Sequence, residues 1–162
     1  MSMEKLYIEP GIGIGPVKLG MSKNEVEECI RNCSRNLLNK YNNSFYIEKL
    51  YKLSYDSSDS VNFIEIDAIG SSDFDCLFNE INVFKTKAEE LVEEIDKISK
   101  YDREQWDLGF TYHFPELGLT LWRPVIRKAD DLKEGWFKEL DPEIQEDEMR
   151  NLYFRVVSLK SK

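Results

Sequence analysis

A helix-start signal occurs twice in this chain, and a pair of strand-like segments follows it each time. The first signal is Ser22 with Glu25 three residues later, and the second is Thr86 with Glu89. A serine or threonine with a glutamate at this spacing forms a capping box, in which the two side chains satisfy each other's free backbone N–H groups. Apolar residues at helical spacing follow both signals. The sequence therefore predicts two capped helices, the second of which runs from Thr86 to about Lys100.

The segments expected to form strands alternate apolar and polar residues or form short apolar runs between turn-forming residues. A turn-rich DSSDS separates the first pair, and Pro115-Glu116 separates the pair that follows the second helix. The expected strands are residues 45–55, 61–69, 76–84, 109–114, 117–122 and 152–159.

This order of elements predicts an α+β fold in a single domain spanning residues 1–162. We expect a mostly antiparallel sheet with helices on one side, built from two helix-plus-hairpin units in tandem. The units span about residues 1–70 and 71–124, and an acidic C-terminal segment and a final strand occupy residues 125–162.

Three alternating glycines, Gly11, Gly13 and Gly15, suggest a phosphate-binding loop. A Walker loop ends in Gly-Lys-Ser/Thr, whereas Lys18 is followed by leucine here. A dinucleotide-binding loop opens directly into a helix, whereas Pro16 and the run VKL come before the helix signal. We therefore expect the glycines to shape the approach of the chain to the first helix, and we expect no cofactor.

The formal net charge of −9 argues against nucleic acid or an anionic membrane surface as a partner. No stretch approaches the roughly 20 apolar residues that a membrane-spanning helix needs. The first residues, MSMEKLYIEP, lack the pattern of a signal peptide. Three cysteines form no dense disulfide framework, which suits a reducing compartment. These features predict a cytoplasmic protein.

Candidate catalytic and metal-binding residues are few. His113 is the only histidine, and no nucleophile lies beside it in the sequence. Cys29 and Cys33 would share a helix face but lack two further zinc ligands, so we expect them and Cys76 to be small buried side chains. We expect His113 to be structural.

The carboxylates give no stronger signal for catalysis. Glu65 and Asp67 alternate with apolar residues, which indicates the solvent face of a strand. Asp73 and Asp75 lack the ligand spacing of a calcium loop. The sequence therefore predicts neither a catalytic residue nor a metal site.

The segment from Asp130 to Glu148 holds nine acidic residues and two lysines, so it carries most of the acidic excess. Such a segment is commonly a solvated surface, with Trp136 packed in the core. Aromatic rings surrounded by carboxylates also suit the binding of a basic protein, because the rings supply buried area and the charges speed the encounter. The residues predicted to bind a partner are Asp130, Asp131, Glu134, Trp136, Phe137, Glu143 and Asp147.

The run VKLGMSKNEVEECI resembles the Gly-Met-Ser/Thr-x-x-x-Val helix entry of small outer-membrane assembly lipoproteins and secreted β-lactamase-inhibitor proteins, with matches at Gly20, Met21, Ser22 and Val26. The resemblance implies helix-plus-sheet units, which in the inhibitors form a tandem repeat whose concave sheet grips another protein. The chain lacks the signal peptide, lipidation cysteine and disulfides of these families. In size, charge and lack of a catalytic motif it also resembles the immunity proteins that accompany bacterial polymorphic toxins.

These features favour a non-enzymatic protein that binds and neutralises a basic protein partner, as the immunity component of a bacterial toxin pair does. One alternative is a small hydrolase or a small-molecule-binding protein that uses His113 in the concavity of the sheet. Another is a structural or assembly adaptor. The gene of a toxin lies beside the gene of its immunity protein, so the identity of the neighbouring genes would distinguish the first hypothesis from the others.

Overall fold

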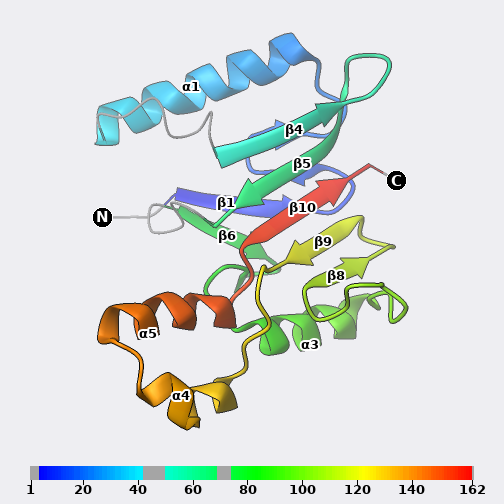
Figure 1. Ribbon diagram of the computed structural model, residues 1–162. Coiled ribbons are helices and arrows are strands. Elements are labelled where there is room, and N and C mark those ends of the chain that lie inside the picture. Colours follow the sequence, from blue (N-terminus) through cyan, green and yellow to red (C-terminus); the bar gives the residue numbers. More distant parts are fainter. Residues whose placement is uncertain (1–3, 42–49, 69–73, 162) are drawn as a thin grey trace.

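The computed structural model describes residues 4–41, 50–68 and 74–161. They form an α+β fold with one mixed sheet, one antiparallel sheet and helices at the ends of the sheets (Figure 1). The strands are β1 (Glu4–Glu9), β2 (Gly13–Ile14), β3 (Val17–Lys18), β4 (Tyr51–Tyr55), β5 (Val61–Asp67), β6 (Phe74–Phe78), β7 (Ile81–Asn82), β8 (Thr111–Phe114), β9 (Leu119–Trp122) and β10 (Val156–Lys160). The helices are α1 (Lys23–Tyr41), α3 (Ala88–Ile98), α4 (Gly135–Lys138) and α5 (Pro142–Met149), with 3₁₀ turns η1 (Ala129–Lys133) and η2 (Arg150–Leu152).

The first sheet has the strand order β3-β2-β1-β6-β7. Its centre is a parallel pairing of β1 with β6, in which Leu6 lies opposite Cys76. Alternation in β1 places Leu6 and Ile8 in the core and leaves Tyr7 exposed. The parallel pair joins segments far apart in the sequence, so no local pattern could predict it.

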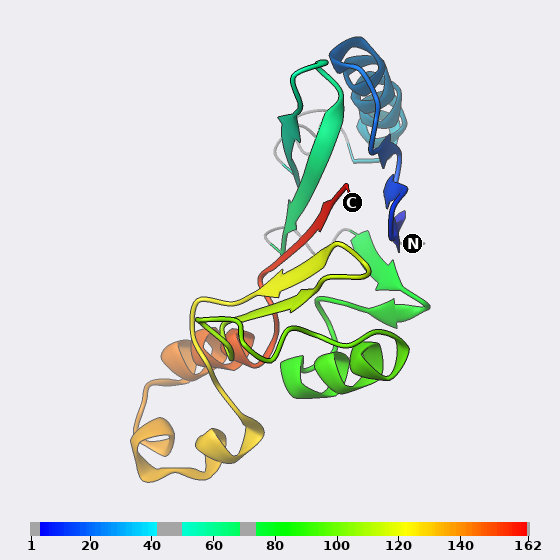
Figure 2. The same ribbon diagram turned by 90° about the vertical axis from the view of Figure 1, so that its right-hand side faces the viewer.

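The second sheet has the order β4-β5-β10-β9-β8, and all its pairings are antiparallel. Residues that face inward on three neighbouring strands are fully buried, and these are Ile64, Ile66, Leu119, Leu121, Val157 and Leu159. Figure 2 shows the two sheets facing each other, with α1 at one end and α3 at the other. Leu91 and Ile95 of α3 are also fully buried and complete the core.

The predicted α+β class and the predominance of antiparallel pairing are confirmed, but the strands form two sheets. β8 and β9 join the same sheet as β4 and β5, whereas β6 and β7 join β1. The tandem arrangement of two units is therefore not confirmed. None of the helices in the described ranges has the length and apolar character that a bilayer crossing needs.

The first predicted helix start is confirmed, because the Glu25 backbone N–H donates to Ser22 Oγ at 3.2 Å. The second is wrong by one residue, because the N-cap is Lys87 instead of Thr86 and makes no side-chain capping bond; α3 begins at Ala88 and ends at Ile98. Glu89 and Glu90 in the first turn favour this start, because carboxylates there oppose the positive end of the helix dipole.

Predicted strand boundaries differ from the structure where turns or pairing intervene. The expected strand 76–84 is a hairpin of β6 and β7, because Asn79 and Glu80 both have positive φ angles, as a tight two-residue turn requires. The hairpin of β8 and β9 around Pro115 is confirmed. Residues 45–49 of the first expected strand and residue 69 of the second lie outside the described residues.

The glycine-rich stretch forms the narrow hairpin of β2 and β3. A Cβ at Gly13 would clash with the backbone oxygen of Val17, so only glycine permits this approach. Gly15 has φ +60° and faces Tyr51, whose hydroxyl donates to the Ile14 carbonyl at 3.0 Å. The glycines thus have a structural role, in joining the first sheet to β4 of the second.

Candidate functional site

The predicted binding segment forms a separate lobe, made of η1, α4 and α5, which we call the acidic lobe (residues 129–149). It projects away from the two sheets (Figures 1 and 2). The lobe is inserted between β9 and β10, which are direct antiparallel neighbours. The sheet itself would need only a short connection between these two strands. The lobe is therefore an insertion in that connection.

The acidic lobe buries very little apolar surface against the rest of the protein. Phe137, which is 7 % exposed, is the only buried residue in its three elements. Trp136, Ile144 and Met149 are 43 %, 46 % and 45 % exposed. A helix on a globular protein usually packs an apolar stripe against the core, and α5 does not. The lobe thus presents apolar side chains to solvent.

The two aromatic residues of the predicted binding set have different environments. Phe137 is buried, and the Trp136 ring lies edge-on to it at 5.9 Å between centroids. The buried Phe137 ring supports Trp136 and offers little surface of its own. Of this pair, Trp136 is the ring that a partner could contact directly.

The acidic residues of the predicted set are mostly exposed. Asp130, Glu134, Glu143 and Asp147 lie at the surface of the lobe. Asp131 instead accepts a hydrogen bond from the Lys128 backbone N–H at 2.9 Å and so helps to start η1. The binding role of the whole set remains a prediction, but its members now divide into surface residues and supports.

Arg127, in the segment that leads from β9 into the acidic lobe, contacts both α4 and α5. Its Nε donates to Glu148 Oε2 at 3.0 Å, and its guanidinium lies 4.7 Å from the centroid of the Trp136 ring. Within the lobe, the Gln145 amide donates to the carbonyls of Phe137 and Lys138, which joins α5 to α4. One arginine thus orients Trp136 and holds α5.

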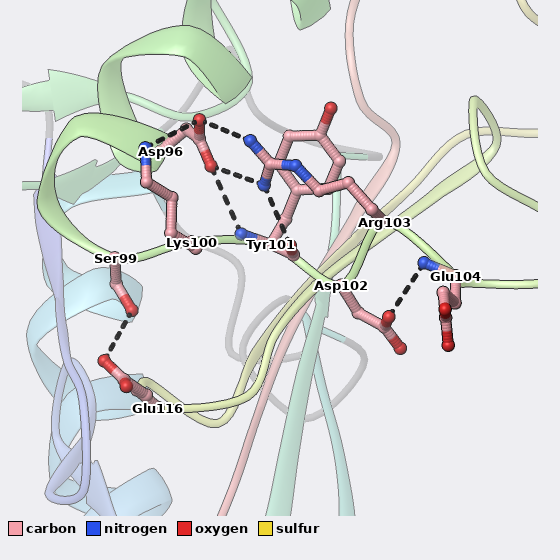
Figure 3. Close-up of polar contacts among 8 residues, drawn as sticks. All are labelled: Asp96, Ser99, Lys100, Tyr101, Asp102, Arg103, Glu104 and Glu116. Carbon is pink, nitrogen blue, oxygen red and sulfur yellow. Dashed lines mark hydrogen bonds and ion pairs between the residues drawn. The ribbon is translucent and has the colours of Figure 1, made fainter.

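A second feature is the loop of residues 99–110 between α3 and β8, which we call the Trp106 loop. Arg103 anchors its first half: the two terminal nitrogens donate to the two oxygens of Asp96 at 2.7 and 2.8 Å (Figure 3). The same guanidinium donates to the Tyr101 carbonyl and lies 3.6 Å from the centroid of the Tyr101 ring. Hydrogen bonding by Arg103 holds the pKa of Asp96 well below its usual range.

The second half of the Trp106 loop is organised by Asp107. Its two oxygens accept hydrogen bonds from the Gln105 amide and the Thr111 hydroxyl, which lower the pKa of Asp107. Asp102 accepts from the Glu104 backbone N–H at 2.9 Å, and its own N–H donates to the His113 carbonyl. Trp106 lies between these fixed points and is 90 % exposed.

The sequence pattern predicts no functional surface in YDREQWD, which lies between the second predicted helix and the expected strand 109–114. A signal was present, since a tryptophan stands among acidic residues there as Trp136 does in the acidic lobe. Its exposure depends on tertiary contacts that the sequence does not show.

The interaction between Asp96 and Arg103 makes the stability of this loop depend on pH. The pKa of Asp96 is lower in the folded protein than the unfolded value of about 3.9, so the pair stabilises the fold above that pH and the effect is lost as pH falls further. Asp96→Asn should therefore lower the melting temperature at about pH 7, and the difference between the two proteins should be smaller at about pH 2.5.

The matched control is Glu94→Gln, which removes only an exposed pair with Lys97 on the same helix. It should change the melting temperature little, because exposed pairs one turn apart contribute little to stability. A deficit in Asp96→Asn that is equal at both pH values would show that the charge of Asp96 is not what stabilises the loop.

The residues considered for catalysis are separated in the structure. His113 Nδ1 lies 2.9 Å from Thr120 Oγ1 on the neighbouring strand, and partial burial lowers the pKa of the imidazole. Cys76 belongs to the other sheet, and burial raises the pKa of its thiol to about 12. A thiol in this state is a poor nucleophile at neutral pH. The geometry gives the hydrolase alternative no support.

The other polar candidates have structural partners or lie outside the described residues. Glu65 and Asp67 face solvent and form ion pairs at 3.9 Å with Lys52 and Arg155. Asp73 and the side chain of Cys33 lie outside the described residues. Across the part of the chain that is described, no three His, Cys, Asp or Glu residues form a group that could hold a metal ion.

Comparisons of the chain with protein-family models, with curated proteins and with solved structures find no match.

Proposed function

We propose that this chain is a non-enzymatic protein that binds a basic protein partner through the acidic lobe. The observation that carries the proposal is the exposure of Trp136, Ile144 and Met149 on a lobe dense in carboxylates. All three belong to one lobe of the chain, and exposed apolar side chains that gather in one part of a surface commonly mark an interaction site. The surrounding negative charge selects a basic partner.

The lobe combines the two properties that a fast and durable complex needs. Carboxylates with exposed positions, such as Glu134 and Glu143, create a long-range attraction that raises the association rate. Trp136 is already oriented by Arg127 and Phe137, so little side-chain entropy is lost when a partner covers it. We expect the charges to govern association and the ring to govern dissociation.

The proposal extends to a biological role: in the cytoplasm of a bacterium, the chain neutralises a toxin as its immunity protein. Toxic nucleases have basic sites because they bind phosphates, so an acidic lobe could occupy such a site. The test is co-expression of the chain with each neighbouring gene product that arrests growth. Restored growth supports the role, whereas binding without rescue would leave the chain a binding protein of another kind.

Charge reversal on the lobe tests the binding surface itself. Asp130→Lys with Glu134→Lys should slow association with a basic partner at least about tenfold at low salt, and less as salt rises, because ions screen the attraction. The dissociation rate should change little. Asp131 is left intact because it starts η1. Surface plasmon resonance at several salt concentrations gives both rates.

The matched control is Glu27→Lys with Glu28→Lys on the exposed face of α1, which lies at the opposite end of the molecule (Figure 1). Both variants change the net charge by the same amount. If the α1 variant slows association as strongly, the partner responds to total charge and the acidic lobe is not the docking site.

A further inference from the structure

Trp106 is the most exposed large apolar side chain among the described residues, with 90 % of its surface accessible. Leu108, Phe110 and Trp122 are each 38 % exposed. Trp122 lies opposite Thr111 on the outer face of β9, and the Thr111 hydroxyl holds Asp107, the neighbour of Trp106. Exposed apolar residues therefore collect around one loop, and tryptophan is among the residues that contribute most to binding at interfaces.

The loop that carries Trp106 is fixed on both sides. Arg103, the Asp96 carboxylate and the Tyr101 ring form a closed network before it, as Figure 3 shows. Asp107, bound by Gln105 and Thr111, fixes the chain after it. Because the backbone is already ordered, binding at Trp106 would not require the loop to lose further conformational freedom.

The charges around Trp106 define what the loop could bind. Arg103 and Lys100 share the single negative charge of Asp96, and with Asp102, Glu104 and Asp107 included the six residues still carry a net negative charge. Asp102, Glu104 and Asp107 form no ion pair within the described residues, and hydrogen bonds keep Asp107 ionised. An exposed tryptophan on a loop that carries these carboxylates favours a cation, because the face of the ring attracts positive charge.

We propose that the Trp106 loop is a second docking surface, which binds a cationic protein segment by placing an arginine or lysine against the Trp106 ring between Asp102, Glu104 and Asp107. Nucleic acid is disfavoured because its phosphates would face these carboxylates. A second copy of the chain is disfavoured because it brings the same three carboxylates to the contact. The surface is separate from the acidic lobe and does not depend on it.

The test uses a soluble peptide in which arginine alternates with glycine and a twin in which neutral citrulline replaces each arginine. The three indole N–H signals of ¹⁵N-labelled protein report separately on Trp106, Trp122 and Trp136, after assignment with single Trp→Phe variants. The arginine peptide should shift the Trp106 signal saturably, and the citrulline peptide should not. Trp106→Ser should weaken binding of the arginine peptide about fivefold.

The control is Ile12→Ser, which removes another exposed apolar side chain, 52 % accessible, from the turn between β1 and β2 in the other sheet. It should leave the affinity unchanged. The proposal is overturned if the Trp106 signal does not move, if both peptides move it equally, or if sedimentation shows a dimer that Trp106→Ser dissociates. A shift of the Trp136 signal alone would overturn the proposal for the Trp106 loop and would still support the acidic lobe as a binding surface. A shift of the Trp106 signal alone would support the Trp106 loop and count against the acidic lobe.

Discussion

Replacing residues 129–149 with a short Gly-Ser linker is expected to abolish binding of a basic partner while both sheets remain folded. β9 and β10 are hydrogen-bonded neighbours, in which Trp122 lies opposite Val156 and the Arg155 N–H donates to the Trp122 carbonyl. A short linker can span this distance because the strands are antiparallel. Removing every anchor and most of the charge should weaken binding at least about a hundredfold.

Circular dichroism and thermal unfolding establish whether the shortened chain folds, and calorimetry measures binding. The control is a full-length chain in which the acidic residues of the segment Asp130 to Glu148, other than Asp131 and Glu148, become the corresponding amides, because those two hold η1 and α5. This control keeps the exposed apolar side chains and removes most of the charge, so it should bind with a slower association rate. If the shortened chain binds normally, the partner contacts another surface, and the proposed binding site must be assigned to that surface.

Arg123→Ala is expected to cost about 2–3 kcal/mol of folding free energy, the largest effect that we expect from a single substitution. The Arg123 side chain is 1 % exposed, although it carries a charge. Its Nε donates to the Gly109 carbonyl at 2.9 Å, a terminal nitrogen donates to Glu89, and its guanidinium lies 5.5 Å from the Phe154 ring. Alanine leaves a cavity and an unsatisfied carbonyl.

Two controls separate these contributions. Arg123→Met fills much of the cavity and should recover part of the loss, whereas Glu89→Gln should change stability little because Glu89 is half exposed. Urea unfolding at neutral pH measures all three variants. Hydrogen exchange at residues 105–110 should rise in Arg123→Ala, because Gly109 belongs to the Trp106 loop. Unchanged stability would show that the buried guanidinium contributes nothing net.

Local signals predicted the parts of the fold that depend on neighbouring residues. The Ser22 cap and the hairpin around Pro115 follow from side chains a few positions apart, and both are confirmed. The parallel pairing of β1 with β6 depends on the whole chain. The turn at Asn79-Glu80 was missed because neither residue is glycine, which is the usual signal for positive φ angles.

The candidate binding surfaces also combine features that the sequence shows with features that only the tertiary structure shows. The charge of the acidic lobe could be read from the sequence, but the different burial of Trp136 and Phe137 could not, because adjacent aromatic residues give no indication of which one packs inward. Trp106 was missed because its exposure follows from how Arg103 and Asp107 hold the backbone on either side. Composition indicated the kind of partner, and tertiary structure indicated where it could bind.

The position of β10 at the centre of the second sheet has a consequence for synthesis on the ribosome. β5 and β9 are joined only through β10, whose residues are translated after the acidic lobe. Until Val156–Lys160 leave the exit tunnel, no strand pairs with both β5 and β9. The inward-facing side chains of these two strands then remain accessible to chaperones. The second sheet therefore cannot close until β10 has been translated.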